Sequence, residues 1–350
     1  MPWEDVKDIL RPNMDDIHMG VMKVDEDKCN KCELCMQNCP FQCWEKNEEG
    51  YPILKEEYAC FSCYNCKIAC PNDAISIIDS YHVDAGVFKT LPYPLPAEMP
   101  REPKDIEGSP SEWNEIEKMV LNRRSVRNFK DKPVPESIIE RILEAGRFAP
   151  SGGNCQPWKF VVITNKEMIT EIDKAAINAI TQVYNLYTND NSVKALEGMV
   201  KGPPPNAGGA DPRIILGGMG TVSKEGGLKP SLGASAIILL LADERSIGNP
   251  QISIGICGQT MNLVANSLGI KATWSGFFAW GASVHPTLRK ELGIEPPWIS
   301  VSSLCLGYPK FKQEGIVPRE RRPVKWFRED KDKSGVPEKS DIPQTEKQEA

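Results

Sequence analysis

The sequence predicts two domains, a compact cysteine-rich domain followed by a larger domain of the α/β or α+β class. Nine of the twelve cysteines lie between Cys29 and Cys70, and a proline-rich stretch follows them. After that stretch, helical and strand-like segments alternate. The expected units are a cysteine domain, a proline-rich linker, a second domain and a charged, disordered tail, at residues 1–79, 80–112, 113–327 and 328–350.

Composition and charge exclude several classes of protein. The longest apolar stretch, Ala236 to Ala242, is far shorter than the roughly 20 residues of a membrane helix, and the first residues lack a signal-peptide pattern. We therefore expect no membrane span and a cytoplasmic location. Residues 1–110 hold 11 Lys and Arg against 21 Asp and Glu, a net charge of −10, and the other 240 residues carry +4. This acidic unit argues against a nucleic-acid partner and favours a partner with a basic docking surface.

Two cysteine runs share one spacing. CNKCELCMQNCP begins at Cys29 and CFSCYNCKIACP at Cys60, and both read C-x2-C-x2-C-x3-C-P. Residues 20–80 thereby resemble bacterial two-cluster ferredoxins, in which the fourth cysteine of each run ligates the other cluster. A pair of structural zinc sites is the alternative, but such sites usually combine two C-x2-C knuckles. The resemblance implies two [4Fe-4S] clusters, cluster one held by Cys29, Cys32, Cys35 and Cys70 and cluster two by Cys60, Cys63, Cys66 and Cys39.

Cys43 is a ninth cysteine beside the first run. It could substitute for a ligand, but we expect it to pack against the cluster.

The elements of the second domain follow from periodicity and breakers. Helices are predicted from Trp113 to about Asn122, from Pro135 to Gly146 and from Gln259 to Leu268. Short apolar runs predict buried strands at 158–165, 234–243 and 298–308. Neither helix nor strand is expected in the linker. The glycine- and proline-rich residues 187–230 favour a mobile loop or lid.

Two further motifs, RRSVRNF from Arg123 and APSGGNCQPW from Ala149, occur in order. Together they resemble the nitroreductase superfamily of FMN enzymes, and most closely the branch with iodotyrosine deiodinase and the flavin-cleaving enzyme of cobalamin synthesis. The resemblance extends over residues 113 to about 327. It implies an α+β nitroreductase-like fold of the obligate-dimer type, preceded here by the two-cluster ferredoxin-like domain. It also implies a homodimer with FMN at its interface.

The chemistry of FMN explains the residue types at these positions. A phosphate dianion is best held by guanidinium groups, and a cation near flavin N1 favours the reduced flavin. Glycines 152 and 153 allow close backbone approach, and an Asn side chain can bond the amide edge of the flavin. GIKATWSGF aligns with the segment that reaches N5, and PRERRP with a basic segment that returns to the phosphate. The resemblance thus implies FMN contacts from Arg123, Arg124, Ser125, Arg127, Ser151, Asn154, Gln156, Trp274, Ser275, Gly276, Arg321 and Arg322.

No catalytic residue is assigned, because Ser275 stands where the commonest nitroreductases have an acidic residue. The predicted function is an iron-sulfur flavoenzyme that takes electrons from reduced ferredoxin or a similar low-potential donor. Its small organic acceptor is a nitro, quinone, activated-alkene or halogenated compound. Two alternatives remain open: an electron-transfer protein that links flavin to a protein partner, and an NAD(P)H-oxidising ferredoxin reductase. Oxygen-sensitive clusters suggest an anaerobic host.

Overall fold

The computed structural model describes residues 13–86, 88–90, 97–189, 191–192, 211–313, 315–325 and 327, so the predicted tail lies outside the described residues. In chain order, the N-terminal part contains η1 (Met14–Asp16), β1 (Ile17–His18), β2 (Val21–Val24), α2 (Leu34–Gln37), β3 (Trp44–Lys46), β4 (Pro52–Leu54), α3 (Asn65–Ala69), β5 (Ile75–Asp79), β6 (His82–Val83), β7 (Ala97–Glu98) and η2 (Pro103–Asp105).

The C-terminal part contains the longer helices and strands. They are α4 (Glu115–Asn122), α5 (Glu136–Arg147), η3 (Gly152–Asn154), β8 (Trp158–Ile163), α6 (Lys166–Thr188), the π-helix η5 (Arg213–Met219), α8 (Gly220–Ser223), β9 (Ala236–Asp243), α9 (Pro250–Ser267), β10 (Lys271–Trp274), α10 (Gly276–Val284), α11 (Pro286–Glu291), β11 (Trp298–Gly307) and β12 (Arg319–Glu320).

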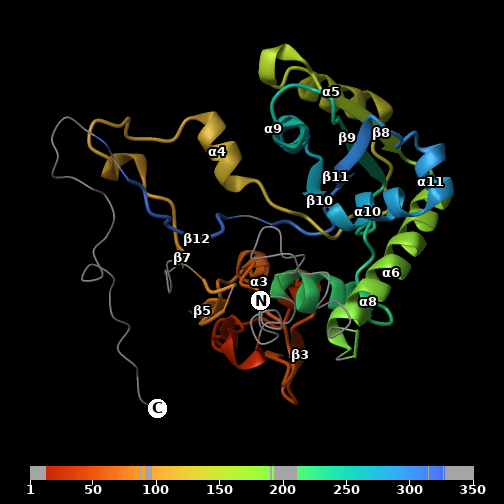
Figure 1. The fold of residues 1–350 in the computed structure, drawn as a ribbon. Helices are drawn as coiled ribbons and strands as arrows, with labels where there is room; N and C mark the ends of the chain where they lie inside the picture. Colours follow the sequence, from red (N-terminus) through yellow and green to blue (C-terminus); the bar gives the residue numbers. More distant parts are fainter. Residues whose placement is uncertain are drawn as a thin grey trace.

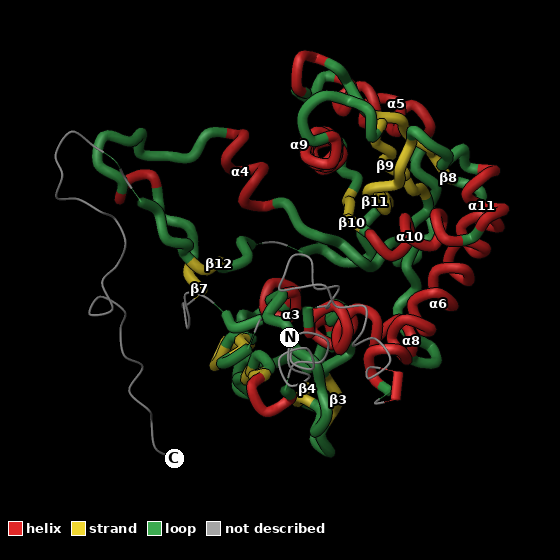
Figure 2. The backbone as a smooth tube through the Cα atoms, in the orientation of Figure 1, coloured by secondary structure: helices red, strands yellow, loops and turns green. Residues whose placement is uncertain are grey.

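An antiparallel sheet of order β10-β11-β9-β8 forms the centre of this part (Figure 1). β9 is its most buried strand, because residues 236–242 are apolar and are 0% exposed. Successive side chains of a strand point to opposite faces, so β9 contributes to two cores. Ile238 and Leu240 pack with α5 and α9, whereas Ile237 and Leu239 pack with α6, α10 and α11. Helices thus cover both faces of the sheet, as Figure 2 shows.

The N-terminal domain is a small assembly of β2–β5 and β3–β4 ribbons with the short helices α2 and α3. Its two cysteine runs have the same backbone conformation. The residues before and after the second cysteine of each run have a positive φ, at Lys31 and Glu33 in one run and Ser62 and Tyr64 in the other. This repeated left-handed pattern extends the sequence duplication to the backbone.

Two sequence expectations need correction. The described residues of the expected linker, 80–86, 88–90 and 97–112, include short pairings, because β6 pairs with β1 and β7 pairs with β12, and η2 adds a helical turn. Proline blocks donation from its own nitrogen only, so the proline-free pairs of β6 and β7 remain possible.

The second correction concerns the expected lid. Residues 213–223 of this segment are helical and packed, with Ile215, Met219 and Val222 buried, while 193–210 lie outside the described residues. Among the described residues, no helix is both long and apolar enough to cross a membrane.

Candidate functional site

Four cysteines surround one small cavity in the N-terminal domain. Cys29, Cys32, Cys35 and Cys70 line it together with Val24, Pro52 and Ile75. Burial, with help from charge on the other three sulfurs, raises the pKa of the Cys35 thiol to about 12. Sulfurs this close to one another form a donor set suited to iron or another soft metal. The structure therefore brings together the four cysteines predicted to hold cluster one.

The other four cysteines form a second group. Burial raises the pKa of the Cys66 thiol, with contributions from the sulfurs of Cys63, Cys39 and Cys60. Cys39 comes from the first run and the other three come from the second, which matches the crossed arrangement predicted for cluster two. Which sulfurs bind iron stays a prediction, since proximity alone does not establish ligation.

Cys43 lies within this second group. Its side chain is 1% exposed, and its thiol is hydrogen-bonded to the sulfurs of Cys39 and Cys60. The Cys43 backbone nitrogen also donates to Cys39 Sγ at 3.4 Å. The Cys43 thiol hydrogen bond lowers the pKa of Cys39 to about 6. Cys43 is therefore placed to donate to the sulfurs of two predicted ligands.

A cavity of about 520 Å³, here called the arginine cavity, lies between α4 and β12. Its lining includes Arg123, Arg124, Arg319 and Arg321 together with Glu98. Asn114 begins α4 with a capping box, and Arg123 and Arg124 follow directly after the helix. Burial lowers the pKa of Arg123, and the positive charge of Arg319 lowers it further. Such a convergence of cations is suited to a multiply charged anion.

Arg124 is the residue that best tests whether a phosphate fits. It is 6% exposed, and its Nη1 donates to the carbonyl oxygens of Leu121 and Arg123 at 3.0 and 2.8 Å. Within the described part of the chain, its buried Nε and Nη2 have no hydrogen-bond partner. Burial, with help from Arg123 and Arg319, lowers its pKa to about 10. The two unpaired guanidinium donors and the lowered pKa of this buried cation both fit an anionic group at this position.

Sequence reasoning missed several cations here, and one of them, Arg101, also lines the arginine cavity. Arg319 belongs to the same PRERRP run as the predicted Arg321 and Arg322, but it is the one whose charge acts on Arg123 and Arg124. Arg321 lines the cavity and pairs with Glu98 at 2.7 Å, whereas Arg322 pairs with Glu320 at 2.6 Å and does not line it.

Lys271 is a further missed cation. It lines an adjoining cavity of about 460 Å³ that also reaches Arg124, and burial followed by the charge of Arg124 lowers its pKa. It stands in the GIKATWSGF segment, where the sequence draws attention to Trp274 and Ser275 instead.

The RRSVRNF segment also contacts the cysteine domain. Burial lowers the pKa of Arg127, while charge on Cys63 and Cys39 raises it. Burial raises the pKa of Cys63 to about 11, and Arg127 opposes this effect. Asn128 Nδ2 donates to the Gln37 carbonyl at 2.9 Å, and Gln313 donates to the side chain of Asn38. Arg127 therefore faces the second cysteine group, and Ser125 connects this segment to the sheet through a parallel bridge to Ala272 of β10.

Three predicted FMN contacts lie away from the arginine cavity. Asn154 and Gln156 are exposed and have a positive φ, and Ser151 Oγ accepts from the Gln156 nitrogen at 2.9 Å. Their turn packs against Ile247, which Gly152 and Gly153 approach closely. Within one chain, the structure does not bring these residues to Arg123 and Arg124.

The predicted FMN contacts Trp274, Ser275 and Gly276 lie where β10 ends and α10 begins. Ser275 caps that helix, is 7% exposed, and donates through its hydroxyl to the Pro230 carbonyl at 2.6 Å. The Trp274 ring packs against Gly258 of α9, where an added Cβ would lie 2.3 Å from the ring. Trp274 thus has a core role in the single chain, and Gly276 has open space beside it. None of the three lines the arginine cavity.

Comparison with known proteins matches both halves of the chain. The model of the nitroreductase family matches residues 120–308, and that of a 4Fe-4S dicluster domain matches residues 28–75. A nitrobenzene nitroreductase of Ectopseudomonas oleovorans is 27% identical over 208 residues, which cover 55% of this chain and 86% of that protein. An NADH dehydrogenase of Thermus thermophilus is 43% identical over 57 residues, or 16% of this chain and 28% of that protein.

Among solved structures, a nitroreductase with bound FMN from Desulfitobacterium hafniense is 25% identical, with a TM-score of 0.43, and the match covers 59% of this chain and 95% of that one. The two family matches confirm the predicted fusion and the predicted oxidoreductase class. The chain belongs to the nitroreductase family and carries a 4Fe-4S dicluster domain ahead of its nitroreductase domain.

Proposed function

We propose that this protein is an iron-sulfur flavoenzyme. It takes electrons from a low-potential donor such as reduced ferredoxin and carries them through two [4Fe-4S] clusters to FMN for the reduction of a small organic acceptor. Nitro, quinone, activated-alkene and halogenated compounds are the acceptor classes. Iron-sulfur clusters supply one-electron steps and FMN supplies two-electron chemistry, while the protein positions both.

One observation carries this proposal: the RRSVRNF segment touches both candidate cofactor sites. Arg123 and Arg124 line the arginine cavity, and three residues later Arg127 lies beside the sulfurs of Cys63 and Cys39. Asn128 continues the contact by bonding to Gln37, two residues before Cys39. A short, hydrogen-bonded segment therefore fixes the spacing between the two sites, which electron transfer between them requires.

The residues that would hold FMN follow from their chemistry. Arg123, Arg124 and Arg319 would bind the phosphate, since they converge on one cavity and Arg124 offers unpaired donors. Arg127 would supply the cation that favours the reduced flavin, and charge on Cys63 and Cys39 acts on it. Because Asn154 and Gln156 are exposed, Ser151 is half-buried beside them, and all three lie apart from this cavity in one chain, we assign them to the FMN of the partner subunit in a homodimer.

The two cysteine groups would have different roles. Cluster two would serve the flavin, because Cys39 and Cys63 are the sulfurs that face Arg127. Cluster one would be the entry point, since Cys32 is exposed and lies in the acidic domain. Negative charge around an exposed cluster suits a donor protein with a basic docking surface, which fast association favours.

The test begins with anaerobic purification and measurement of iron, sulfide and FMN in one sample. About eight irons and one FMN per chain are expected for two [4Fe-4S] clusters and one flavin. Rapid mixing with reduced ferredoxin should then bleach the flavin. Cys35→Ala should remove cluster one, leave FMN bound and abolish this bleaching. Cys257→Ser is the matched control, because Cys257 is a buried thiol that bonds to the Gly146 carbonyl in the nitroreductase domain. Zinc in place of iron, or ferredoxin reduction of FMN that persists in Cys35→Ala, would refute the proposal.

A second candidate runs electrons in the opposite direction, from NAD(P)H through FMN to ferredoxin. It is favoured by the similarity of 57 residues to the NADH dehydrogenase of Thermus thermophilus. Anaerobic NADH should then bleach the flavin faster than reduced ferredoxin does. Bleaching only by ferredoxin would exclude this direction.

A further inference from the structure

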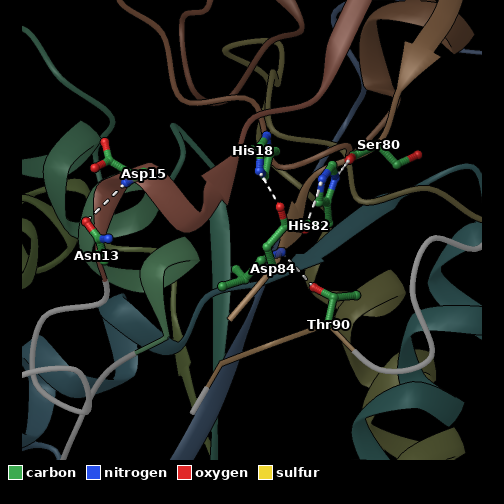
Figure 3. A network of polar contacts seen from close by, with 8 residues as sticks. Asn13, Asp15, His18, Ser80, His82, Asp84 and Thr90 are labelled. Atoms are coloured by element: carbon green, nitrogen blue, oxygen red, sulfur yellow. Dashed lines mark hydrogen bonds and ion pairs between the residues drawn. The ribbon is translucent and has the colours of Figure 1, made fainter. Parts of the chain in front are cut away.

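Three side chains meet where the start of the cysteine domain pairs with the segment that leaves it. His18, His82 and Asp84 each offer one possible ligand atom, and these atoms all lie within 4.8 Å of one another. Figure 3 shows the two imidazole rings beside the Asp84 carboxylate. This cluster is separate from both cysteine groups and from the arginine cavity.

Backbone pairing fixes the three positions. His18 of β1 lies directly opposite His82 of β6, and the Asp84 nitrogen donates to the Asp16 carbonyl at 2.9 Å. Residues two apart on a strand share a face, so His82 and Asp84 project to the same side. Thr90 holds the end of this strand through bonds between its nitrogen and the Val83 carbonyl and between its Oγ1 and the Val83 nitrogen.

His82 forms a hydrogen bond of the kind that metal-ligating histidines form. Its Nδ1 lies 2.8 Å from the Ser80 carbonyl oxygen, and because a carbonyl can only accept, Nδ1 carries the proton. In the neutral ring, Nε2 therefore carries the lone pair, and it lies 3.7 Å from Asp84 Oδ1. A backbone carbonyl that fixes the tautomer of a ligating histidine is a regular feature of protein metal sites. His82 is 5% exposed, so its ring is held in place.

His18 supplies the third possible metal ligand, and its ring can turn. Its Nε2 lies 2.8 Å from Asp84 Oδ2, and its ring stacks on that of His82 with centroids 4.4 Å apart and planes 12° apart. Parallel rings do not aim their lone pairs at one point, so shared coordination requires one ring to turn. The His18 side chain is 44% exposed and has room to do so.

We propose that His18, His82 and Asp84 bind a divalent transition-metal ion of the zinc type. Two imidazole nitrogens and one carboxylate oxygen suit Zn²⁺ and its first-row neighbours, whereas Mg²⁺ and Ca²⁺ prefer all-oxygen ligands. Water would complete the coordination on the exposed side of His18.

Such an ion would link the segment before the cysteine runs to the segment after them. Both iron-binding runs, residues 29–70, lie between His18 and His82 in the sequence. Each flank of the site is also attached to the second run, because the Gly20 nitrogen donates to the Cys60 carbonyl at 2.9 Å and the Tyr81 nitrogen to Ser62 Oγ at 2.7 Å. A link across a long loop stabilises the folded state by restricting the unfolded chain. The site is therefore structural, and it supports the loop that begins cluster two.

The experiment uses the full, iron-loaded protein under anaerobic conditions. It is equilibrated with Zn²⁺, freed of loose metal by dialysis, and analysed for zinc and iron together. One zinc per chain should remain beside the full complement of iron. X-ray absorption at the zinc edge should show only nitrogen and oxygen neighbours at about 2.0–2.2 Å, without the sulfur shell at about 2.3 Å that zinc in a cysteine site would give.

Variants assign the site. His18→Ala and Asp84→Asn should each weaken Zn²⁺ affinity at least tenfold while leaving the iron content unchanged, which reports that the domain is folded. His285→Asn is the control, because the only histidine outside the cluster caps α11 by accepting from the Leu288 nitrogen, and Asn retains a capping acceptor. The heat-induced loss of cluster absorbance should shift to higher temperature with Zn²⁺ in the wild type and the control alone. Absence of zinc from the iron-loaded protein, a sulfur shell, or unchanged affinity in His18→Ala would overturn the proposal.

Discussion

A buried charge without a full set of partners destabilises a fold, and Arg124 carries such a charge. Burial is the main reason that its pKa falls well below the usual arginine value, to about 10. Because the folded-state value lies below the unfolded one, folding disfavours the charged form at every pH below about 10. A shift of this size corresponds to about 3 kcal/mol. The penalty would be relieved when an anion occupies the arginine cavity.

Arg124→Met should therefore have opposite effects on stability and on cofactor binding. The FMN-free protein should melt a few degrees higher, because the apolar side chain removes the buried charge, while the Kd for FMN should rise roughly 10- to 100-fold. Calorimetry of the FMN-free form and fluorescence titration with FMN measure the two effects. Arg141→Met, on the exposed side of α5, should change neither. A stable variant with unaltered FMN affinity would place the phosphate elsewhere.

Cys43 allows a second test at the residue scale. Its thiol bonds to Cys39 and Cys60, and hydrogen bonds to cluster sulfurs raise the reduction potential. Cys43→Ala should retain all the iron and lower the potential of one cluster by about 40 mV, the equivalent of one hydrogen bond of about 1 kcal/mol. Redox titration followed by electron paramagnetic resonance measures this shift. Loss of four irons would instead identify Cys43 as a ligand.

Among the elements, η5 joins the two domains. Gly217 lies against Phe61 and Phe41 of the cysteine domain, and Gly218 lies against Phe277 of α10. Phe61 is itself held by edge contacts to Phe41 and Tyr81. A side chain at residue 217 would therefore displace the helix from the cysteine domain, since the aromatic rings have little freedom to move.

Gly217→Ala should slow electron transfer between the clusters and FMN while both cofactors remain bound. An added Cβ would lie 2.4 Å from the Phe61 ring, so the domains must separate slightly. Stopped-flow reduction by ferredoxin, with iron and FMN contents as checks, measures the effect. Gly220→Ala is the matched control, because its Cβ would come no closer than 3.3 Å to its neighbours. Equal rates in the two variants would show that η5 does not set the domain spacing.

Regular elements with strong local signals could be predicted, and elements that depend on distant contacts could not. β9 was predictable because a run of apolar residues is buried on both faces, and α5 because its apolar positions repeat at helical spacing. α9 begins at Pro250, earlier than predicted, because Asn249 caps it and its glycines obscure the pattern. η5 was not predictable at all, since its glycines are used for close packing against Phe61 and Phe277.

In the candidate site, too, local patterns were predictable and arrangements that depend on distant contacts were not. The resemblance of the two runs to bacterial two-cluster ferredoxins groups the eight cysteines as the structure does. The choice of Arg319 over Arg322 depends on which residues of β12 turn toward α4, and the pairing of β12 with β7 decides this. No local signal in the PRERRP run contains that information.

At the scale of the whole molecule, the exposed side of α9 and its flanking loops is apolar. Phe148, Ile247, Ile252 and Ile256 are 73%, 61%, 61% and 41% exposed, which is unusual for so many large apolar side chains in neighbouring segments. The turn with Asn154 packs on Ile247, so this surface adjoins the predicted FMN contacts that lie apart from the arginine cavity. A second copy of the chain bound here would bury the surface and deliver that turn to the other FMN site.

If a second copy of the chain binds at this surface, Ile252→Asp should give a monomer and weaken FMN binding at least tenfold, because a buried unpaired charge is costly at an interface. Light scattering after size exclusion gives the mass, and the flavin content gives the second result. Ile78→Asp, a substitution at an equally exposed isoleucine of β5, should preserve both. A monomeric wild type that still binds FMN would refute the shared site.

The repeated left-handed residues of the two cysteine runs affect how the protein responds to the loss of iron. Lys31, Glu33, Ser62 and Tyr64 hold a conformation that is costly for residues other than glycine, at about 1 kcal/mol or more each. Iron that gathers the sulfurs would keep these loops in place. A chain that has lost its iron would relax there and expose its backbone to proteases. The backbone geometry of the cluster sites would thus make iron-free protein more susceptible to proteolysis than the iron-loaded protein.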